Sequence, residues 1–277
     1  MTDISIRITG QAGRITLQRP QALNAMTYEM CLAIEAALDE WRADPAVKLV
    51  VMDAEGDRAF CSGGDIADMY ATGTAGDFSY GQKFWADEYR LNAKIFEYPK
   101  PVVSFLQGFT MGGGVGIGCH GSHRIVGDTS QIAMPEVGIG LVPDVGGTLM
   151  LALAPERLGE YLGTTASRMN ASDAIFAGFA DIYIPEGKWP VLIAQLETTG
   201  DTACLTPETP AEIGPIQSQM PEITKHFRGV GLSDVLTTLE NDDSEFAQKT
   251  LKQLRRNSPL SMACTFEILY RLRGSNI

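Results

Sequence analysis

An apolar segment that runs into consecutive glycines constrains this chain more than any other feature. Residues 101–106 begin with a proline and continue with two valines, which favour an extended strand. Residues 112–114 are all glycine, at a point where a helix is expected to begin. The first turn of a helix leaves backbone N–H groups unpaired, and glycine lets a bound oxygen atom approach them closely. The segment therefore predicts an oxyanion-binding turn or, in the simpler alternative, a turn needed only for tight packing.

A second strand with a similar ending comes earlier in the chain. Residues 47–53 form a nearly continuous apolar run, which is typical of a parallel strand covered on both faces. The chain then passes through residues 59–65, which contain two adjacent glycines. Two such strand ends in one α/β chain can direct two backbone N–H donors at a single acyl oxygen. Residues 70–80 are rich in glycine and threonine and predict a mobile loop.

Two carboxylates lie eight residues apart on a loop bent by glycine and proline. Glu136 and Asp144 both fall within residues 135–147. Such side chains can act as a general base, a nucleophile or an acceptor for a substrate hydroxyl. The alternative is that both are helix caps or solvated loop acids.

The charge and the cysteines limit the classes of partner. The 277 residues carry a net charge of −12, which excludes a general nucleic-acid or anionic-membrane surface and favours a small-molecule substrate. Five scattered cysteines without a CxxC pair predict reduced thiols and a cytoplasmic location. We find no export signal and no run of apolar residues long enough to span a membrane.

Other signals compete with this interpretation. Residues 116–121 fit the GxGxxG pattern of dinucleotide-binding proteins, but they begin inside the expected helix and not at the end of the strand. His120 and His123 could bind a metal ion, yet no third ligand stands at suitable spacing. We therefore predict no metal site and no nucleotide cofactor.

Three motifs together resemble the enoyl-CoA hydratase/isomerase (crotonase) superfamily. They are FCSGGD at residues 60–65, MGGGVG at residues 111–116 and MPEVGIGLVPDVGG at residues 134–147. The resemblance extends over residues 4–274. It implies an α/β fold, a crotonase-type spiral of ββα units with a trailing helical region, that binds an acyl-CoA. It also implies that the thioester oxygen lies between the amide of Gly113 and that of Gly64 or its neighbour Ser62.

Within this superfamily the motifs are most similar to the 3-hydroxyisobutyryl-CoA hydrolase family. Hydratases of the superfamily carry two catalytic glutamates, of which the second corresponds to Glu136, whereas Gly116 occupies the position of the first. The hydrolase pattern instead matches Glu88, Gly113, Glu136 and Asp144. The resemblance thus implies hydrolysis of a small branched 3-hydroxyacyl-CoA thioester, a reaction of valine degradation.

The resemblance also implies a role for each carboxylate. Glu136 would attack the thioester carbonyl or deprotonate a water molecule that does so, and Asp144 and Glu88 would bind the substrate hydroxyl or position the water. Glu88 lies in a charged helical run, so a solvated helix face explains it equally well. A hydratase or isomerase of the same fold and a non-catalytic acyl-CoA-binding relative are the alternatives.

Four prolines between residues 207 and 221 predict a domain boundary. We expect a catalytic, acyl-CoA-binding core over residues 1–205 and a helical region over residues 206–277. The hydrolase family usually continues for several dozen residues past the position of Arg273, so part of a lid is expected to be missing. Coenzyme A would enter only as part of the substrate. The superfamily tends to form trimers and hexamers, which predicts a homo-oligomer.

Overall fold

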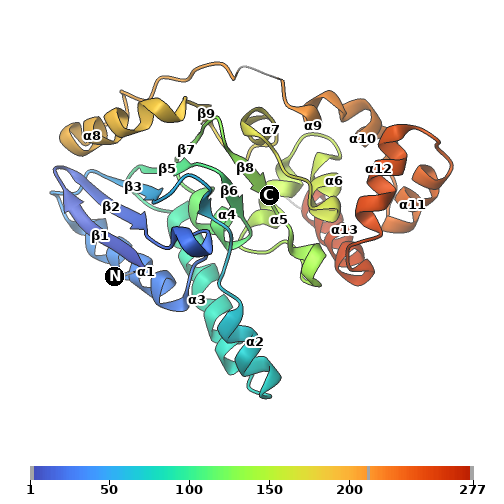
Figure 1. Ribbon diagram of the computed structural model, residues 1–277, viewed down its shortest axis with the longest axis horizontal. Coiled ribbons are helices and arrows are strands. Elements are labelled where there is room, and N and C mark those ends of the chain that lie inside the picture. The colour runs from blue at the N-terminus through green and yellow to red at the C-terminus, as the bar shows by residue number, and fades with distance from the viewer. Residues whose placement is uncertain (1–2, 211–212, 275–277) are drawn as a thin grey trace.

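Two sheets form the centre of the structure (Figure 1), a computed structural model that describes residues 3–210 and 213–274. The larger sheet contains, in spatial order, β1 (Ile4–Thr9), β2 (Ala12–Leu17), β3 (Leu49–Ala54), β5 (Val102–Leu106), β7 (His123–Val126) and β9 (Ile182–Tyr183). The smaller sheet contains β4 (Ala59–Cys61), β6 (Phe109–Met111) and β8 (Gln131–Ala133). β1 and β2 form an antiparallel hairpin, and the other paired strands are parallel.

Successive strands alternate between the two sheets. β3, β5 and β7 lie in the larger sheet, and the strand that follows each of them lies in the smaller one. A helical segment follows each pair: α2 (Ala67–Thr74) and α3 (Ser79–Phe96), then α4 (Gly113–Gly118), then the 3-10 turn η2 (Glu136–Ile139) with α5 (Gly147–Leu153). This confirms the spiral of ββα units. Because β4, β6 and β8 are parallel neighbours, the segments that leave them start at the same edge.

The larger sheet is covered on both faces, which explains the continuous apolar run in β3. Val50 and Met52 belong to the main hydrophobic core, whereas Leu49 and Val51 belong to a second cluster on the other face. The second cluster includes residues of α8 (Trp189–Thr199). The main core includes the buried face of α1 (Tyr28–Ala43), which begins where Thr27 accepts a hydrogen bond from the Met30 amide at 3.2 Å.

The prediction of a mobile loop over residues 70–80 is wrong. This segment contains most of α2 and the start of α3, and the two helices project from the body of the molecule (Figure 1). Thr72 and Thr74 each donate a hydroxyl hydrogen bond, both 2.8 Å long, to the carbonyl four residues earlier. These bonds occupy the threonine hydroxyls inside the helix, where they would otherwise compete with the backbone.

Helices dominate the chain after residue 147, and they share the main core with the sheets. α6 (Leu158–Thr165) and α13 (Pro259–Arg273) pack against α5 and against each other. In Figure 1, α10 to α13 lie at the end of the molecule opposite the β1–β2 hairpin. One hydrophobic cluster includes Ile15, Leu151 and Leu269, so the core continues across the predicted boundary at residue 205. The remaining short segments are η1 (Pro20–Ala22), α7 (Ala171–Phe176), η3 (Glu186–Lys188), α9 (Pro215–Ser218), α10 (Met220–His226), α11 (Leu232–Glu240) and α12 (Glu245–Leu254).

Within residues 3–210 and 213–274, no helix combines the length and the apolar content needed to cross a bilayer.

Candidate active site

A pocket of about 190 Å³ lies where β4, α3, α4 and η2 meet. It contains every residue that the sequence predicted for the site: Ser62, Gly64, Glu88, Gly113, Glu136 and Asp144. These residues come from four segments that are distant in the sequence. The spiral brings them together because β4, β6 and β8 end at one edge of the smaller sheet.

The amides of Gly64 and Gly113 lie close together in this pocket. A Cβ atom placed on Gly113 would lie 3.0 Å from the Gly64 nitrogen. Among the described residues, no acceptor pairs with either N–H group. Met26 pairs with the residues on both sides of Gly64, which turns the Gly64 N–H to the opposite side of the strand. Two unpaired donors therefore face one region of the pocket.

Ser62 was the alternative to Gly64, and its amide is already in use. The Ser62 N–H donates a hydrogen bond to the Leu23 carbonyl at 3.0 Å. Of the two amides that the resemblance left open, the Gly64 amide is the one free to bind a ligand.

The glycines at the start of α4 allow two backbone segments to approach closely. Gly112 has a φ of 52°, a left-handed conformation that favours glycine. A Cβ atom on Gly114 would collide with the Cys61 carbonyl oxygen at the end of β4. The tight packing of these two backbone segments brings the two unpaired amides together. Both interpretations of the glycine-rich turn therefore hold.

Glu136, at the start of η2, is a buried carboxylate of the same pocket. Its side chain lies within 3.0 Å of where a Cβ on Gly112 would be, and its Oε2 atom has no hydrogen-bond partner among the described residues. Burial, together with the smaller effects of the nearby Asp144 and Glu88, raises its pKa to about 8. An unpaired carboxylate in this environment has a proton affinity suited to acid–base chemistry near neutral pH.

Glu88 is 3% exposed, so the solvated-face alternative is wrong. Its Oε1 atom has no partner among the described residues and lies 2.5 Å from the position of a Cβ on Gly113. Burial and the charge of Asp144 raise its pKa to about 8. The preceding residue, Asp87, lies on another face of α3, where Tyr28 and Arg90 bind it.

Asp144 is held by a residue that the sequence analysis missed. The Tyr89 hydroxyl donates a hydrogen bond to Asp144 Oδ2 at 2.6 Å, which opposes the upward pKa shift that burial causes in this carboxyl. The next residue, Val145, has a φ of 46°, which is rare for a β-branched side chain. Its carbonyl contacts His120 Nε2 at 2.7 Å. No pattern in the sequence connects positions 55 residues apart, so only the fold reveals this tyrosine.

No positive side chain balances the three carboxylates. Of the described residues that line the pocket, none is lysine, arginine or histidine. The pKa values of all three carboxyls are raised as a result of burial without a cationic partner.

The position of the first hydratase glutamate has no room for a side chain. A Cβ atom on Gly116 would lie 2.7 Å from Asn92 Nδ2 and 2.9 Å from Val145 Cβ. Gly116 and Gly118 are buried in the interior of α4, where Phe60 and Leu106 contact the second of them. The GxGxxG pattern therefore reflects helix packing and not a dinucleotide-binding turn.

Comparison with known families and sequences gives a consistent result. A model of the Enoyl-CoA hydratase/isomerase family matches residues 12–277. A protein of Xenopus tropicalis named "3-hydroxyisobutyryl-CoA hydrolase, mitochondrial" is 37% identical over 94% of this chain and 70% of its own length. An Arabidopsis thaliana protein named "Probable 3-hydroxyisobutyryl-CoA hydrolase 3" is 31% identical over 94% of this chain and 72% of its own length.

Two solved structures have the same fold but are described by other reactions. An enoyl-CoA hydratase from Rhodobacter sphaeroides 2.4.1 is 56% identical, with a TM-score of 0.94 over 98% of this chain and 79% of its own. A carnitinyl-CoA dehydratase from Mycobacterium thermoresistibile is 36% identical, with a TM-score of 0.94 over 100% of this chain and 81% of its own.

The relatives contradict the predicted cytoplasmic location, because the vertebrate proteins are named mitochondrial. Unpaired cysteines indicate a reducing environment, and this property does not distinguish one reducing compartment from another.

Proposed function

Because this chain belongs to the enoyl-CoA hydratase/isomerase family, we propose that it hydrolyses the thioester of a small branched 3-hydroxyacyl-CoA, with 3-hydroxyisobutyryl-CoA as the substrate to test first. One observation carries the proposal: Glu136 is buried, its Oε2 atom and the amides of Gly64 and Gly113 in the same pocket have no partner among the described residues, and Gly116 leaves no second glutamate for hydration. The proposed substrate would place the enzyme in valine degradation.

The two amides would stabilise the negative charge that develops on the thioester oxygen. The N–H groups of Gly64 and Gly113 already lie together, so they need no rearrangement when the carbonyl becomes tetrahedral. The carbon–sulfur bond then breaks, and coenzyme A leaves as a thiol after it takes up a proton. Coenzyme A is part of the substrate, and this reaction requires no other cofactor.

Glu136 would act on the carbonyl carbon in one of two ways. As a nucleophile it forms an acyl-enzyme anhydride that water then cleaves; as a base it removes a proton from the attacking water. Turnover in ¹⁸O-labelled water tests the anhydride route, because label enters the Glu136 carboxylate when water attacks the glutamyl carbonyl of the anhydride and does not enter it when Glu136 acts as a base. Both routes require the ionised form of this side chain.

Glu88 and Asp144 would hold the substrate's 3-hydroxyl group or the attacking water. Both carboxyls line the pocket, and Tyr89 fixes the orientation of Asp144. A hydroxyl that donates to one of these carboxylates would replace part of the solvation that burial removes.

Hydration is the second candidate, because the 56% identical structure from Rhodobacter sphaeroides is described as an enoyl-CoA hydratase. The crowded backbone at Gly116 argues against it, since syn-addition of water in this superfamily uses a second glutamate there. A non-catalytic acyl-CoA-binding protein is the third candidate.

Two substrates separate the three candidates. Purified protein is incubated with 3-hydroxyisobutyryl-CoA, with release of free thiol as the readout, and with crotonyl-CoA, with loss of enoyl absorbance as the readout. Thiol release from the first substrate alone is the expected result. Loss of absorbance without thiol release would identify a hydratase, and binding without either change would identify a non-catalytic relative.

We also propose that the chain forms a trimer or hexamer, as members of this superfamily tend to do. Exposed apolar side chains such as Leu153, Leu260 and Tyr270 on α5 and α13 support an interface on that side. Light scattering on the purified protein measures the subunit number.

A further inference from the structure

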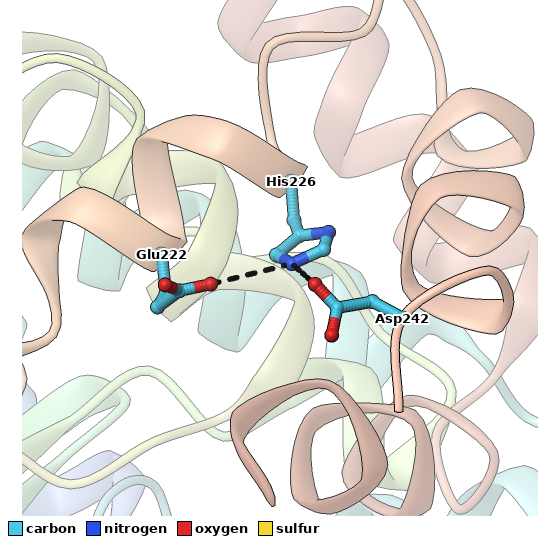
Figure 2. A group of neighbouring side chains, drawn as sticks. All are labelled: Glu222, His226 and Asp242. Atoms are coloured by element: carbon cyan, nitrogen blue, oxygen red, sulfur yellow. Dashed lines mark ion pairs between the residues drawn. The ribbon is translucent and has the colours of Figure 1, made fainter. Parts of the chain in front are cut away.

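A histidine and two carboxylates form a cluster in the C-terminal helical region, apart from the acyl-CoA pocket (Figure 2). Glu222 and His226 lie one turn apart on α10, and Asp242 lies in the connection between α11 and α12. One ligand atom from each residue lies within 4.8 Å of the others. None of these residues lines the pocket described above.

His226 is buried and lacks a hydrogen-bond partner. Its side chain is 2% exposed, and neither ring nitrogen forms a hydrogen bond with a described residue. The ring stacks on Phe246, with centroids 5.9 Å apart and planes 20° apart, so its orientation is restricted. Figure 2 shows the Nε2 edge turned towards both carboxylates. A buried polar group of this kind requires a partner.

The separations fit a shared metal ion better than direct hydrogen bonds. His226 Nε2 lies 3.2 Å from Asp242 Oδ2 and 3.6 Å from Glu222 Oε2. Hydrogen bonds between nitrogen and oxygen are usually about 2.7–3.2 Å long, so the contact with Asp242 stands at the upper limit and the contact with Glu222 lies beyond it. Ligand atoms about 2.0–2.2 Å from a tetrahedral zinc ion lie about 3.3–3.6 Å from one another. The Nε2 atom is therefore placed as one ligand of such a site would be.

We propose that Glu222, His226 and Asp242 bind a zinc ion, with water as the fourth ligand. One imidazole nitrogen and two carboxylate oxygens are donors that zinc commonly takes in proteins. The Ser244 amide binds Asp242 Oδ1 at 2.8 Å, which orients the carboxylate and leaves its Oδ2 atom for the metal. The ion would connect α10 to the segment that leads into α12.

Lys225 competes with the metal for the same oxygens. Its Nζ atom lies 2.5 Å from Asp242 Oδ2 and 3.5 Å from Glu222 Oε2. The Lys225 side chain is 56% exposed, so it can move into solvent when a metal ion takes its place. The ammonium group therefore shows that these two oxygens attract a cation, and its removal should strengthen zinc binding.

Competition with a chromophoric chelator tests the site. The protein of residues 1–277 is treated with chelator and then titrated with zinc chloride, and we expect one zinc ion per chain. Glu222→Gln and Asp242→Asn should each weaken binding at least about tenfold, because even outer-shell changes typically weaken it 10–100-fold. Lys225→Met should strengthen it. The matched controls Asp243→Asn and His123→Gln alter an exposed neighbouring carboxylate and a histidine of β7, and they should bind zinc as the wild type does.

Thermal unfolding supplies a second readout, which also shows whether each variant folds. Zinc should raise the unfolding temperature of the wild type and of the controls, but not that of folded Asp242→Asn protein. The proposal is overturned if the wild type forms no one-to-one zinc complex. It is also overturned if Glu222→Gln and Asp242→Asn bind zinc as tightly as the controls, or if Lys225→Met binds it more weakly.

Discussion

Two carboxylates in the candidate active-site pocket are both buried and incompletely paired. Glu136 and Glu88 are carboxylates with almost no solvent exposure, and each has an oxygen without a partner among the described residues. Burial raises both pKa values to about 8. Buried groups that are left unpaired in this way are costly for stability and are therefore candidates for function.

Glu136→Gln should reduce thiol release by about 10²–10⁴-fold, because glutamine can neither remove a proton nor form the anhydride. The side chain keeps its size, so the fold should be preserved. The rate of coenzyme A release under saturating substrate measures the effect. Glu40→Gln, an exposed position on α1, is the matched control and should behave like the wild type. Full activity of the Glu136 variant would remove this residue from the mechanism.

The two amide donors should respond differently to a methyl group. A Cβ on Gly113 would lie 2.5 Å from Glu88 Oε1, whereas one on Gly64 would lie 3.4 Å from the Phe84 ring, an ordinary contact. Gly113→Ala should therefore lower the turnover number by about 10²–10³-fold, the usual effect of losing an oxyanion donor, and Gly64→Ala should stay within a few-fold of the wild type. Equal losses in both variants would contradict this geometry.

Activity should rise with pH, with a midpoint near pH 8. Glu136 must be ionised to act, and burial holds its pKa near 8, so kcat/KM corrected for spontaneous thioester hydrolysis should increase between pH 6 and pH 8. Glu88→Gln removes one of the neighbouring charges that raise this pKa, so the midpoint should move to lower pH. A midpoint that does not move would show that the charge of Glu88 does not affect the pKa of Glu136.

The same pKa shifts imply that stability falls as pH rises, whereas activity increases. The folded state holds the protons of Glu88 and Glu136 more tightly than the unfolded chain, whose glutamates titrate near 4.5. Their contribution is therefore complete below about pH 4.5 and is lost as pH rises through about 8. In Glu88→Gln, the free energy of unfolding should fall less between pH 5 and pH 8 than in the wild type. Denaturant titrations at several pH values measure this change. The same change in the free energy of unfolding in both proteins would contradict the prediction.

At the scale of elements, α13 supports the loop that carries Glu136. The Ser258 amide at the start of α13 donates a hydrogen bond to the Val137 carbonyl at 2.9 Å, and the Ser258 hydroxyl accepts one from the Ser261 amide at 3.3 Å. One residue thus caps a helix and anchors η2.

Two substitutions separate these functions. Ser258→Ala removes the cap and should lower the free energy of unfolding by about 1 kcal/mol with little change in activity. Ser258→Pro removes the backbone donor as well, and the φ of −64° at this position already suits proline. Displacement of η2 should then reduce thiol release by about tenfold or more. Denaturant titration and the thiol assay give the two values, and equal activities in both variants would show that the amide does not position η2.

At the scale of the whole molecule, the hydrophobic core is shared across the boundary predicted at residue 205. α13 packs on α5 and α6, and Met262, Phe266 and Leu269 belong to the same cluster as strand residues such as Ile15 and Leu17. The described residues after position 205 therefore contribute apolar side chains to the same core as the strands.

Unfolding in urea should accordingly follow a single cooperative transition. Fluorescence, which reports on the tryptophans at positions 41, 85 and 189, and circular dichroism at helical wavelengths should give the same midpoint. Separate transitions would show that residues 206–277 fold as an independent domain.

Much of the site was predictable because its chemistry depends on local backbone. The glycines of residues 60–65 and 112–114 indicated two close backbone approaches, and the loop with Glu136 and Asp144 was evident from its bends. Glu88 was ambiguous, because a charged helical run does not reveal which face is buried. The helix over residues 67–74 was missed because hydrogen bonds from threonine to the backbone are not visible in composition.

The sequence by itself determined the alternation of strands and helices, the two glycine-rich strand ends and the identity of the carboxylates, because these follow from conformational preferences of neighbouring residues. Only the tertiary structure decided that Gly64 and not Ser62 supplies the free amide, that Glu88 is buried, that Tyr89 holds Asp144, and that Asn92 and Val145 close the space beside Gly116. Each of these depends on which distant segments meet, and the spiral winding of the two sheets sets those contacts.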